Sequence, residues 1–181
     1  IPVWLLRQAG RYMPEYREVR SQYKDFFEMI KKPEICKELT LQPLNAFDLD
    51  AAITFTDILT IPDALGLKVN FVKGKGPIFE KSLSSMDKLD LNTNEFHDKI
   101  QYVYSATSLI KENVNVPLIG FTGSPWTLIV YMFYGQSPKD FKSIHSYISE
   151  NSRDAETYLQ ILTDCCIKYA KKQVQHGADC I

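Results

Sequence analysis

The stretch Ala51-Ala52-Ile53-Thr54-Phe55-Thr56-Asp57 decides how the fold of this chain is interpreted. It follows a turn at Asp48-Leu49-Asp50, and its first five residues are short, largely apolar and two-sided, which is typical of a strand buried in a parallel sheet. Asp57 comes just after the carboxyl end of this strand. Parallel α/β barrels place their active sites at that end of their strands. The stretch therefore predicts both a buried strand and a candidate functional carboxylate.

Outward from this stretch, strands and helices alternate along the chain. A second buried strand is predicted at Pro117–Phe121, and Gly177 stops a helix just before a third strand starts. A further extended piece is predicted at Leu67–Val72, with a turn at Gly74–Pro77. Six helices are expected: from Pro14 through Tyr23, from Pro33 through Leu41 with Pro43 bending or ending it, from Thr93 or Asn94 to about Glu112, from Pro125, from Ser137 through Ile148, and from Arg153 to His176.

This alternation predicts an α/β fold with parallel strands and crossover helices. Three main strands cannot close an eight-stranded barrel, and a typical barrel needs about 250 residues. We therefore expect residues 1–181 to be a partial single domain, about the first half of a (β/α)8 TIM barrel with N-terminal helices. Two further signs indicate a piece of a longer protein: the sequence begins at Ile1 without methionine, and it ends where a strand starts. Alone, such a piece is expected to expose an open sheet edge.

The composition excludes several classes of protein. A net charge of −1 gives no overall field for nucleic acid or for a membrane surface. No apolar run reaches membrane-spanning length, and the best candidate, Leu118–Tyr134, is interrupted by glycines and a proline. No signal peptide is recognised. The four cysteines lack a paired spacing, so they favour a reduced intracellular setting. They also offer no convincing zinc site.

The arginines are concentrated at the start of the chain. Four of the five lie in the first twenty residues: Arg7, Arg11, Arg17 and Arg20. Arginine offers a flat fork of donors that binds a carboxylate through two hydrogen bonds, which lysine cannot do. The cluster predicts a site for a ligand with several acid groups. The alternative is that these arginines pair with Glu15, Glu18 or solvent.

Two other positions have both a functional and a structural interpretation. Asp57 is either a buried functional carboxylate, whose burial requires donors around it, or the N-cap of the helix that follows. Tyr131 follows Pro125-Trp126-Thr127 on a new helix. Its phenol either forms a hydrogen bond with a bound molecule or with Asp57, or Tyr131 is an ordinary core residue. These alternatives are open from the residues alone.

Several longer motifs together resemble the uroporphyrinogen decarboxylase family. Arg7-Gln-Ala-Gly-Arg11-Tyr-Met-Pro-Glu-Tyr is similar to its first signature, and Gly120-Phe-Thr-Gly-Ser-Pro-Trp-Thr-Leu128 with Tyr131 is similar to its second. The segments Leu39–Pro43, Phe55–Leu59 and Gly74–Pro77 also match the family. The chain departs from the usual pattern at Leu6 and around Gly135. The resemblance covers essentially all 181 residues.

The resemblance implies a (β/α)8 barrel, a homodimer and no cofactor or metal. It implies that the four acetate arms of uroporphyrinogen III, a tetrapyrrole, lose their carboxyl groups to give coproporphyrinogen III. Asp57 would accept hydrogen bonds from the pyrrole N–H groups, and Arg7 and Arg11 would contact substrate carboxylates or take part in proton transfer. The wider substrate contact set implied by the resemblance is Arg7, Gln8, Ala9, Gly10, Arg11, Arg20, Asp57 and Tyr131.

The chemistry of the reaction agrees with these roles. An octa-acid needs several arginine forks, and a carboxylate near the ring stabilises the protonated-ring cation more than the neutral ground state. Because arginine has a pKa above about 12, Arg7 and Arg11 are favoured as anchors of carboxylates rather than as acids. The family serine and histidine would lie downstream, so residues 1–181 alone are expected to be inactive. Competing interpretations are a methyltransferase on a related barrel and a porphyrin carrier or inactive relative. The expected compartment is the cytosol, or a plastid if a transit peptide lies upstream.

Overall fold

The computed structural model describes residues 1–72, 74–85, 89–138 and 140–181. The chain divides into two compact units, which are described separately. Unit 1 comprises Ile1–Asp57, Ile100–Thr122 and Ala170–Ile181, and unit 2 comprises Ile58–Lys99 and Gly123–Tyr169. The prediction that residues 1–181 form a partial single domain concerns how these two units are arranged, and it stays a prediction.

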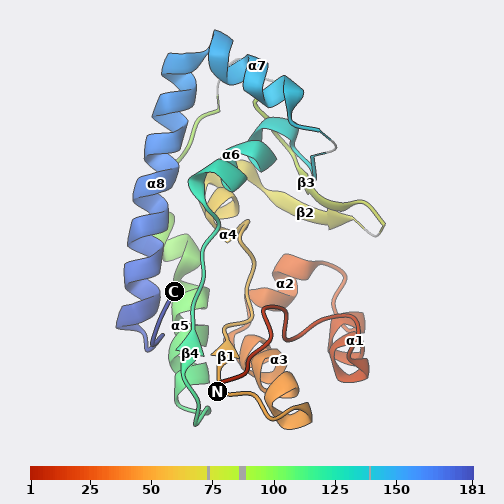
Figure 1. Ribbon diagram of the computed structural model, residues 1–181. Coiled ribbons are helices and arrows are strands. Elements are labelled where there is room, and N and C mark those ends of the chain that lie inside the picture. The colour runs from red at the N-terminus through yellow and green to blue at the C-terminus, as the bar shows by residue number, and fades with distance from the viewer. Residues whose placement is uncertain (73, 86–88, 139) are drawn as a thin grey trace. The chain divides into compact units, whose positions relative to one another are not determined.

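Unit 1 contains the parallel strands. β1 (Ala52–Ile53) pairs in parallel with β4 (Leu118–Ile119), and Ile119 forms a parallel bridge with Cys180 (Figure 1). The backbone N–H groups of Ala52 and Thr54 donate to the carbonyl oxygens of Pro117 and Ile119 at 2.9 and 3.0 Å. The three predicted strand positions are therefore confirmed, and they lie in the order that consecutive strands of a βαβ sheet have.

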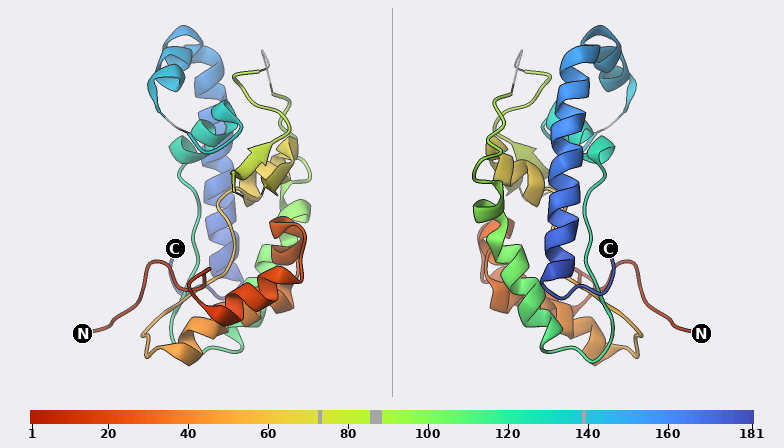
Figure 2. Two further views of the ribbon diagram at one scale, coloured as in Figure 1. Left: turned by 90° about the vertical axis from the view of Figure 1, so that its right-hand side faces the viewer. Right: turned by 90° about the vertical axis from the view of Figure 1, so that its left-hand side faces the viewer.

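Helices pack around these strands within unit 1. They are α1 (Pro14–Ser21), α2 (Phe26–Ile30), α3 (Pro33–Ala46), most of α5 (Phe96–Lys111) and the last turns of α8 (Ser152–Gln175). Figure 2 shows α1, α2 and α3 grouped together, and the first residues of the chain as an extended segment. One face of α5 is buried, because Phe96, Ile100, Val103 and Tyr104 are all in the core.

The helix predicted to run through Leu41 continues past Pro43 to Ala46, so Pro43 does not end it; a bend at Pro43 stays a prediction. A proline inside a helix removes one N–H, but Pro43 is buried, and its own carbonyl accepts a hydrogen bond from the N–H of Phe47 at 2.9 Å. Burial of Cys36, Leu39 and Pro43 on one face offsets the lost hydrogen bond. Phe47 is the exposed residue just after the helix.

Unit 2 begins with α4 (Thr60–Pro62) and the π-helical turn η1 (Asp63–Leu67), followed by an antiparallel hairpin of β2 (Val69–Val72) and β3 (Gly76–Phe79). The extended piece predicted at Leu67–Val72 is thus largely β2. The predicted turn is shorter than expected, because Gly76 and Pro77 already belong to β3.

The rest of unit 2 is helical: α6 (Pro125–Tyr134), α7 (Lys142–Glu150) and most of α8. The predicted start of α7 at Ser137-Pro138 is too early. Gly135 has a left-handed φ of 64° that ends α6, and Gln136 then forms an antiparallel bridge with Ile78. Gln136 is therefore held in this bridge, and α7 begins only at Lys142. No helix in the described part of the chain is long and apolar enough to cross a membrane.

Candidate active site

Asp57 lies where the sequence places it, after the carboxyl end of β1. Its side chain is half-buried. The helix that follows, α4, begins at Thr60 and has Leu59 at its N-cap. The alternative interpretation of Asp57 as the N-cap of that helix therefore does not describe how α4 starts.

An aromatic cluster connects the end of β1 to the N-terminal helices. The ring of Phe55 lies 5.8 Å from that of Tyr16 on α1, at an interplanar angle of 58°. It also lies 6.2 Å from the ring of Phe26 on α2, at 63°. Such tilted contacts between aromatic rings are favourable beyond the area that they bury. The cluster fixes α1, which carries Arg20, against the segment that carries Asp57.

The phenol of Tyr16 is where the charged groups of the site come together. Tyr16 is 7% exposed. Burial raises the pKa of its phenol, the guanidinium groups of Arg20 and Arg11 act to lower it, and the carboxylate of Asp57 acts to raise it. A positive charge stabilises the phenolate and so lowers the pKa, whereas a negative charge destabilises the phenolate and raises the pKa. Three of the predicted site residues therefore lie close enough to one phenol to act on it.

Sequence reasoning did not single out Tyr16. A signal was present, because Met13, Tyr16 and Val19 recur at helical spacing and are all buried. Arg20 stands four residues after Tyr16, so the two share a face of α1. A short helix with a buried face that ends in a half-buried arginine is expected to contact the site through that face rather than to lie in solvent.

Gln8 joins the arginine segment to β1. Its Nε2 donates to the carbonyl oxygen of Ala51 at 2.7 Å, and its Oε1 accepts from the backbone N–H of Ile53 at 2.9 Å. Two other contacts line the same edge of the strand: Asp50 N–H donates to the carbonyl of Val3, and Phe55 N–H donates to Thr40 Oγ1. The edge of β1 is therefore covered at these positions, while the expected open sheet edge of the partial barrel stays a prediction.

The turn that follows Gln8 is held by side chains. Arg17 Nη1 donates to the carbonyl oxygens of Arg11 and Tyr12, at 2.8 and 3.1 Å, and Tyr12 Oη donates to the carbonyl of Gln8. A methyl group on Gly10 would meet only the ring of Tyr12, at 3.5 Å, which is an ordinary contact. The fold itself thus does not require glycine at position 10.

The guanidinium groups differ in their surroundings. Arg7 and Arg11 are exposed, and within the described ranges their side chains form no hydrogen bond or ion pair. The alternative that they pair with Glu15 or Glu18 is therefore not what this structure shows. Arg20 is half-buried, and its Nη1 donates to the carbonyl of Tyr23. Arg11 and Arg20 lie near Tyr16, whereas Arg7 is not among the charges that act on that phenol.

The remaining predicted contacts are less constrained by the structure. Ala9 is half-buried beside Gln8. Tyr131 lies on α6 in unit 2, where it is half-buried and its carbonyl accepts from the N–H of Gly135 at 2.8 Å. Its predicted hydrogen bond near Asp57 stays a prediction. No group of three or more metal-ligating side chains gathers among the residues that the structure describes.

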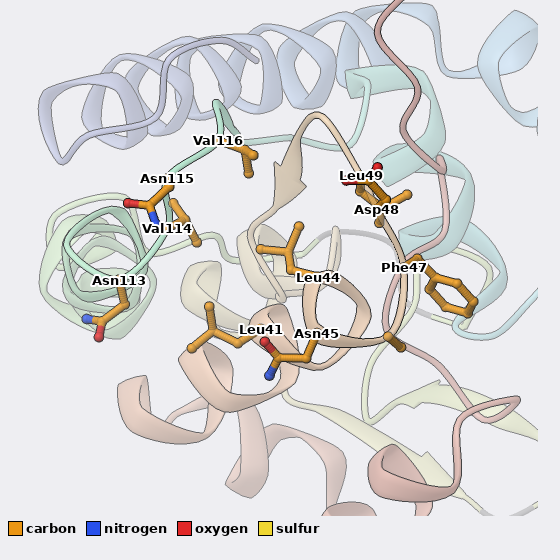
Figure 3. A pocket seen from close by; sticks show the side chains of 11 residues that line it. Leu41, Leu44, Asn45, Phe47, Asp48, Leu49, Asn113, Val114, Asn115 and Val116 are labelled. Atoms are coloured by element: carbon orange, nitrogen blue, oxygen red, sulfur yellow. The ribbon is translucent and has the colours of Figure 1, made fainter.

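A cavity of about 510 Å³ lies at the opposite end of the same strands. Its lining comes from the end of α3 and the loop before β1, and from the loop before β4, as Figure 3 shows. Leu44, Val114 and Val116 lie around it, and Asn113 and Asn115 belong to its polar part. It contains none of the predicted site residues. Its position at the amino ends of β1 and β4 separates it from Asp57.

Comparison with known proteins identifies the family. The family model for uroporphyrinogen decarboxylase (URO-D) matches residues 1–181. The chain belongs to the uroporphyrinogen decarboxylase family.

Its relatives in this family include bacterial proteins of about twice its length. The chain is 45% identical to the uroporphyrinogen decarboxylase of Francisella tularensis subsp. novicida (strain U112) over 183 aligned residues, which cover 99% of this chain and 53% of the relative. It is 46% identical to the uroporphyrinogen decarboxylase of Ruthia magnifica subsp. Calyptogena magnifica, with the same coverage. The chain thus spans about half the length of the relatives that it matches.

A solved structure shows the same fold. A methyltransferase from Methanosarcina mazei matches with a TM-score of 0.68 over 90% of this chain and 48% of that one, at 22% sequence identity. At that identity the likeness concerns the fold alone. The α/β class is confirmed by the parallel strands and their connecting helices, while closure into an eight-stranded barrel stays a prediction.

Proposed function

We propose that the protein that contains these residues removes the carboxyl groups of the four acetate arms of uroporphyrinogen III and gives coproporphyrinogen III. Membership of the family supports this activity. One structural observation carries the assignment of the site: the ring of Tyr16 on α1 lies 5.8 Å from that of Phe55, which follows β1, and the charges of Arg11, Arg20 and Asp57 all affect the pKa of the Tyr16 phenol. A substrate with eight carboxylates and a ring that becomes cationic needs this combination of charges.

The guanidinium groups bind the acid arms. Arg7 and Arg11 are exposed and have no partner within the described ranges, so their donors are available to carboxylates of the substrate. A guanidinium can form two parallel hydrogen bonds with one carboxylate, which fixes both the position and the orientation of the arm. Gln8, Ala9 and Gly10 lie between these arginines and complete the wall, with Arg20 at its base.

Asp57 stabilises the charge that develops on the ring. The pyrrole ring first takes up a proton and becomes a cation. The bond between the arm's methylene carbon and its carboxylate then breaks, carbon dioxide leaves, and the electron pair moves into the cationic ring. A second proton adds to the methylene carbon to give a methyl group, and loss of the first proton restores the ring. A half-buried carboxylate favours the cation over the neutral ring, which lowers the barrier to the bond cleavage.

The other proposed features follow from the same family assignment. Tyr131 would form a hydrogen bond close to the ring, and no cofactor is needed because the substrate's own ring accepts the electrons. The protein would act as a homodimer, and residues 1–181 alone would be inactive. The cytosolic location stays a prediction.

The proposal is tested by anaerobic incubation of the full-length gene product with uroporphyrinogen III. Products are oxidised and separated by chromatography according to their number of carboxyl groups. We expect stepwise appearance of the seven-, six-, five- and four-carboxyl species. Unchanged octacarboxylic substrate at high enzyme concentration would refute the proposed activity, and turnover by purified residues 1–181 would refute the proposed inactivity of this chain alone.

A further inference from the structure

The side-chain amide of Gln8 binds the backbone at β1, the strand that precedes Asp57 in the chain. It donates to Ala51 O at 2.7 Å and accepts from Ile53 N–H at 2.9 Å, and Gln8 is 4% exposed. Both hydrogen bonds lie on the edge of β1 that faces away from β4, because Ala52 and Thr54 donate toward β4. The primary amide of Gln8 thus takes the place that a peptide group of a neighbouring strand would occupy.

The contact of Gln8 with the backbone fixes the position of the Arg7–Arg11 segment relative to β1. Gln8 is adjacent to Arg7 in the chain and three residues before Arg11. Tyr12 Oη donates to the carbonyl of Gln8, and Arg17 donates to the carbonyl of Arg11, so the segment from Gln8 to Tyr12 is tied at both ends. A shift of β1 by one residue would break both amide hydrogen bonds. The backbone of the segment from Gln8 to Tyr12, which carries Arg11, is therefore linked to β1, the strand that precedes Asp57.

We infer that Gln8 is a positioning residue for the proposed decarboxylation, which holds the Arg7–Arg11 segment in register with Asp57. This inference rests on the proposed function and adds to it a role for Gln8 that acts through the arginines. The residue type fits the role, because an amide is both donor and acceptor at the tip of a side chain of this length. Asparagine is shorter by one methylene group, leucine leaves both backbone groups of β1 without a partner, and an ionised glutamate lacks the donor.

The chain offers a matched control in Gln173. Its amide binds the backbone of Phe121 in the same manner: Phe121 N–H donates to Oε1 at 3.1 Å, and Nε2 donates to Phe121 O at 3.0 Å. Gln173 is fully buried and belongs to the end of α8. It carries no arginine segment, so its replacement should affect stability without acting through Arg11.

The first experiment is a pair of double-mutant cycles in the full-length gene product. Gln8→Leu should lower kcat/KM about a hundredfold, since a misplacement of about 1 Å produces losses of that order. Arg11→Ala should then have a much smaller effect in the Gln8→Leu background than in the wild type, because the guanidinium is already misplaced. In the Gln173→Leu background Arg11→Ala should have its full effect. Additive effects of Gln8→Leu and Arg11→Ala would overturn the inference.

A second variant keeps the test decisive if Gln8→Leu does not fold. In Gln8→Glu the protonated carboxyl group can both donate to Ala51 O and accept from Ile53 N–H, whereas the ionised form cannot donate. Burial raises the pKa of such a group. Activity should therefore be close to that of the wild type at low pH and fall as pH rises through the pKa of the introduced carboxyl. A Gln8→Glu profile that parallels the wild-type profile at every pH would also overturn the inference.

Hydrogen exchange separates this inference from the proposed function. The amide of Ile53 should be protected in the wild type and exchange faster in Gln8→Leu, and this measurement needs no substrate. Rapid exchange at Ile53 in the wild type would refute the anchor whatever the activity. Failure of the wild type to convert uroporphyrinogen would refute the proposed function alone.

Discussion

The two ends of the parallel strands in unit 1 differ in chemistry. At the carboxyl end, Asp57 follows β1, and Arg11 and Arg20 act with it on the buried phenol of Tyr16. At the amino end lies a cavity lined mainly by aliphatic side chains and neutral amides, with Phe47 and one carboxylate, Asp48 (Figure 3). The cavity has the volume for a small ligand, but it offers no cluster of opposed charges. The comparison teaches that the two ends of the same strands differ in charge as well as in shape, and the charged carboxyl end is the one that we propose as the site.

The largest effect is expected from Asp57→Asn, which changes only the charge at the carboxyl end. Asparagine has the same shape but cannot stabilise the ring cation, so kcat should fall about a thousandfold. Product chromatography after single-substrate incubation measures this loss. The thermal unfolding temperature serves as a control and should change little. If kcat stays within tenfold of the wild-type value, the role assigned to Asp57 is wrong.

A smaller effect is expected from Arg11→Lys. The positive charge remains, but the flat fork that binds a carboxylate through two hydrogen bonds is lost. KM should rise about tenfold, equivalent to about 1.4 kcal/mol of binding. Arg153→Lys is the control, because Arg153 is an exposed arginine on α8 outside the site. Equal KM values for both variants would show that Arg11 does not bind the substrate.

Substitutions in the cavity at the amino end of the strands should change the stability of the protein rather than its catalytic rate. Leu44 is half-buried and lines the cavity. Leu44→Ala should lower the free energy of unfolding by about 1 kcal/mol, less than for a fully buried leucine. Denaturant titration measures this change, and kcat and KM should match the wild type. A rise in KM for Leu44→Ala would indicate that the cavity takes part in substrate binding.

The smallest effect concerns a pH-dependent contact at the amino end. Lys111 Nζ donates to Asp179, and Leu118 N–H donates to Asp179 Oδ2 at 2.7 Å; these hydrogen bonds lower the pKa of Asp179. A lowered pKa stabilises the fold above the pKa of the unfolded chain, and this contribution is lost as pH falls through the folded value. Because Asp179 is largely exposed, solvent screening keeps the contribution small.

Asp179→Asn should therefore flatten the decrease of stability in acid. Denaturant unfolding between neutral pH and about pH 3 checks this, since the unfolded aspartate titrates near 3.9. Lys111→Gln is the matched control and should remove most of the same dependence. Identical acid dependence in the wild type and in Asp179→Asn would contradict the assignment.

Sequence patterns predicted the elements whose signals are local. Pro14 and Pro125 mark the first helical positions of α1 and α6, and Gly177 follows the end of α8 with a φ of 108°. The apolar strands were predicted because burial on both faces leaves a continuous apolar run. The placement of Asp57 after the first of them follows from chain order alone.

The features that sequence patterns did not predict depend on tertiary contacts. Pro43 stays inside α3 because its face is buried, and Gln136 is outside a helix because it forms a bridge with Ile78 of β3. The role of Tyr16 depends on which charges surround it in space. The use of the Gln8 amide by β1 cannot be deduced from spacing, because residues 8 and 53 are separated by the whole of α1, α2 and α3. These contacts bring distant parts of the chain together, so their energetics override local preference.

The frame around Asp57 is built from groups that do not exchange protons near neutral pH. Gln8, Thr40 and Gln173 hold the strands through amides and a hydroxyl. Burial raises the pKa of Tyr16, so its phenol remains neutral there. Changing acidity across the physiological range should leave this scaffold in place. A dependence of the rate on pH in this range would then have to come from groups other than these supports.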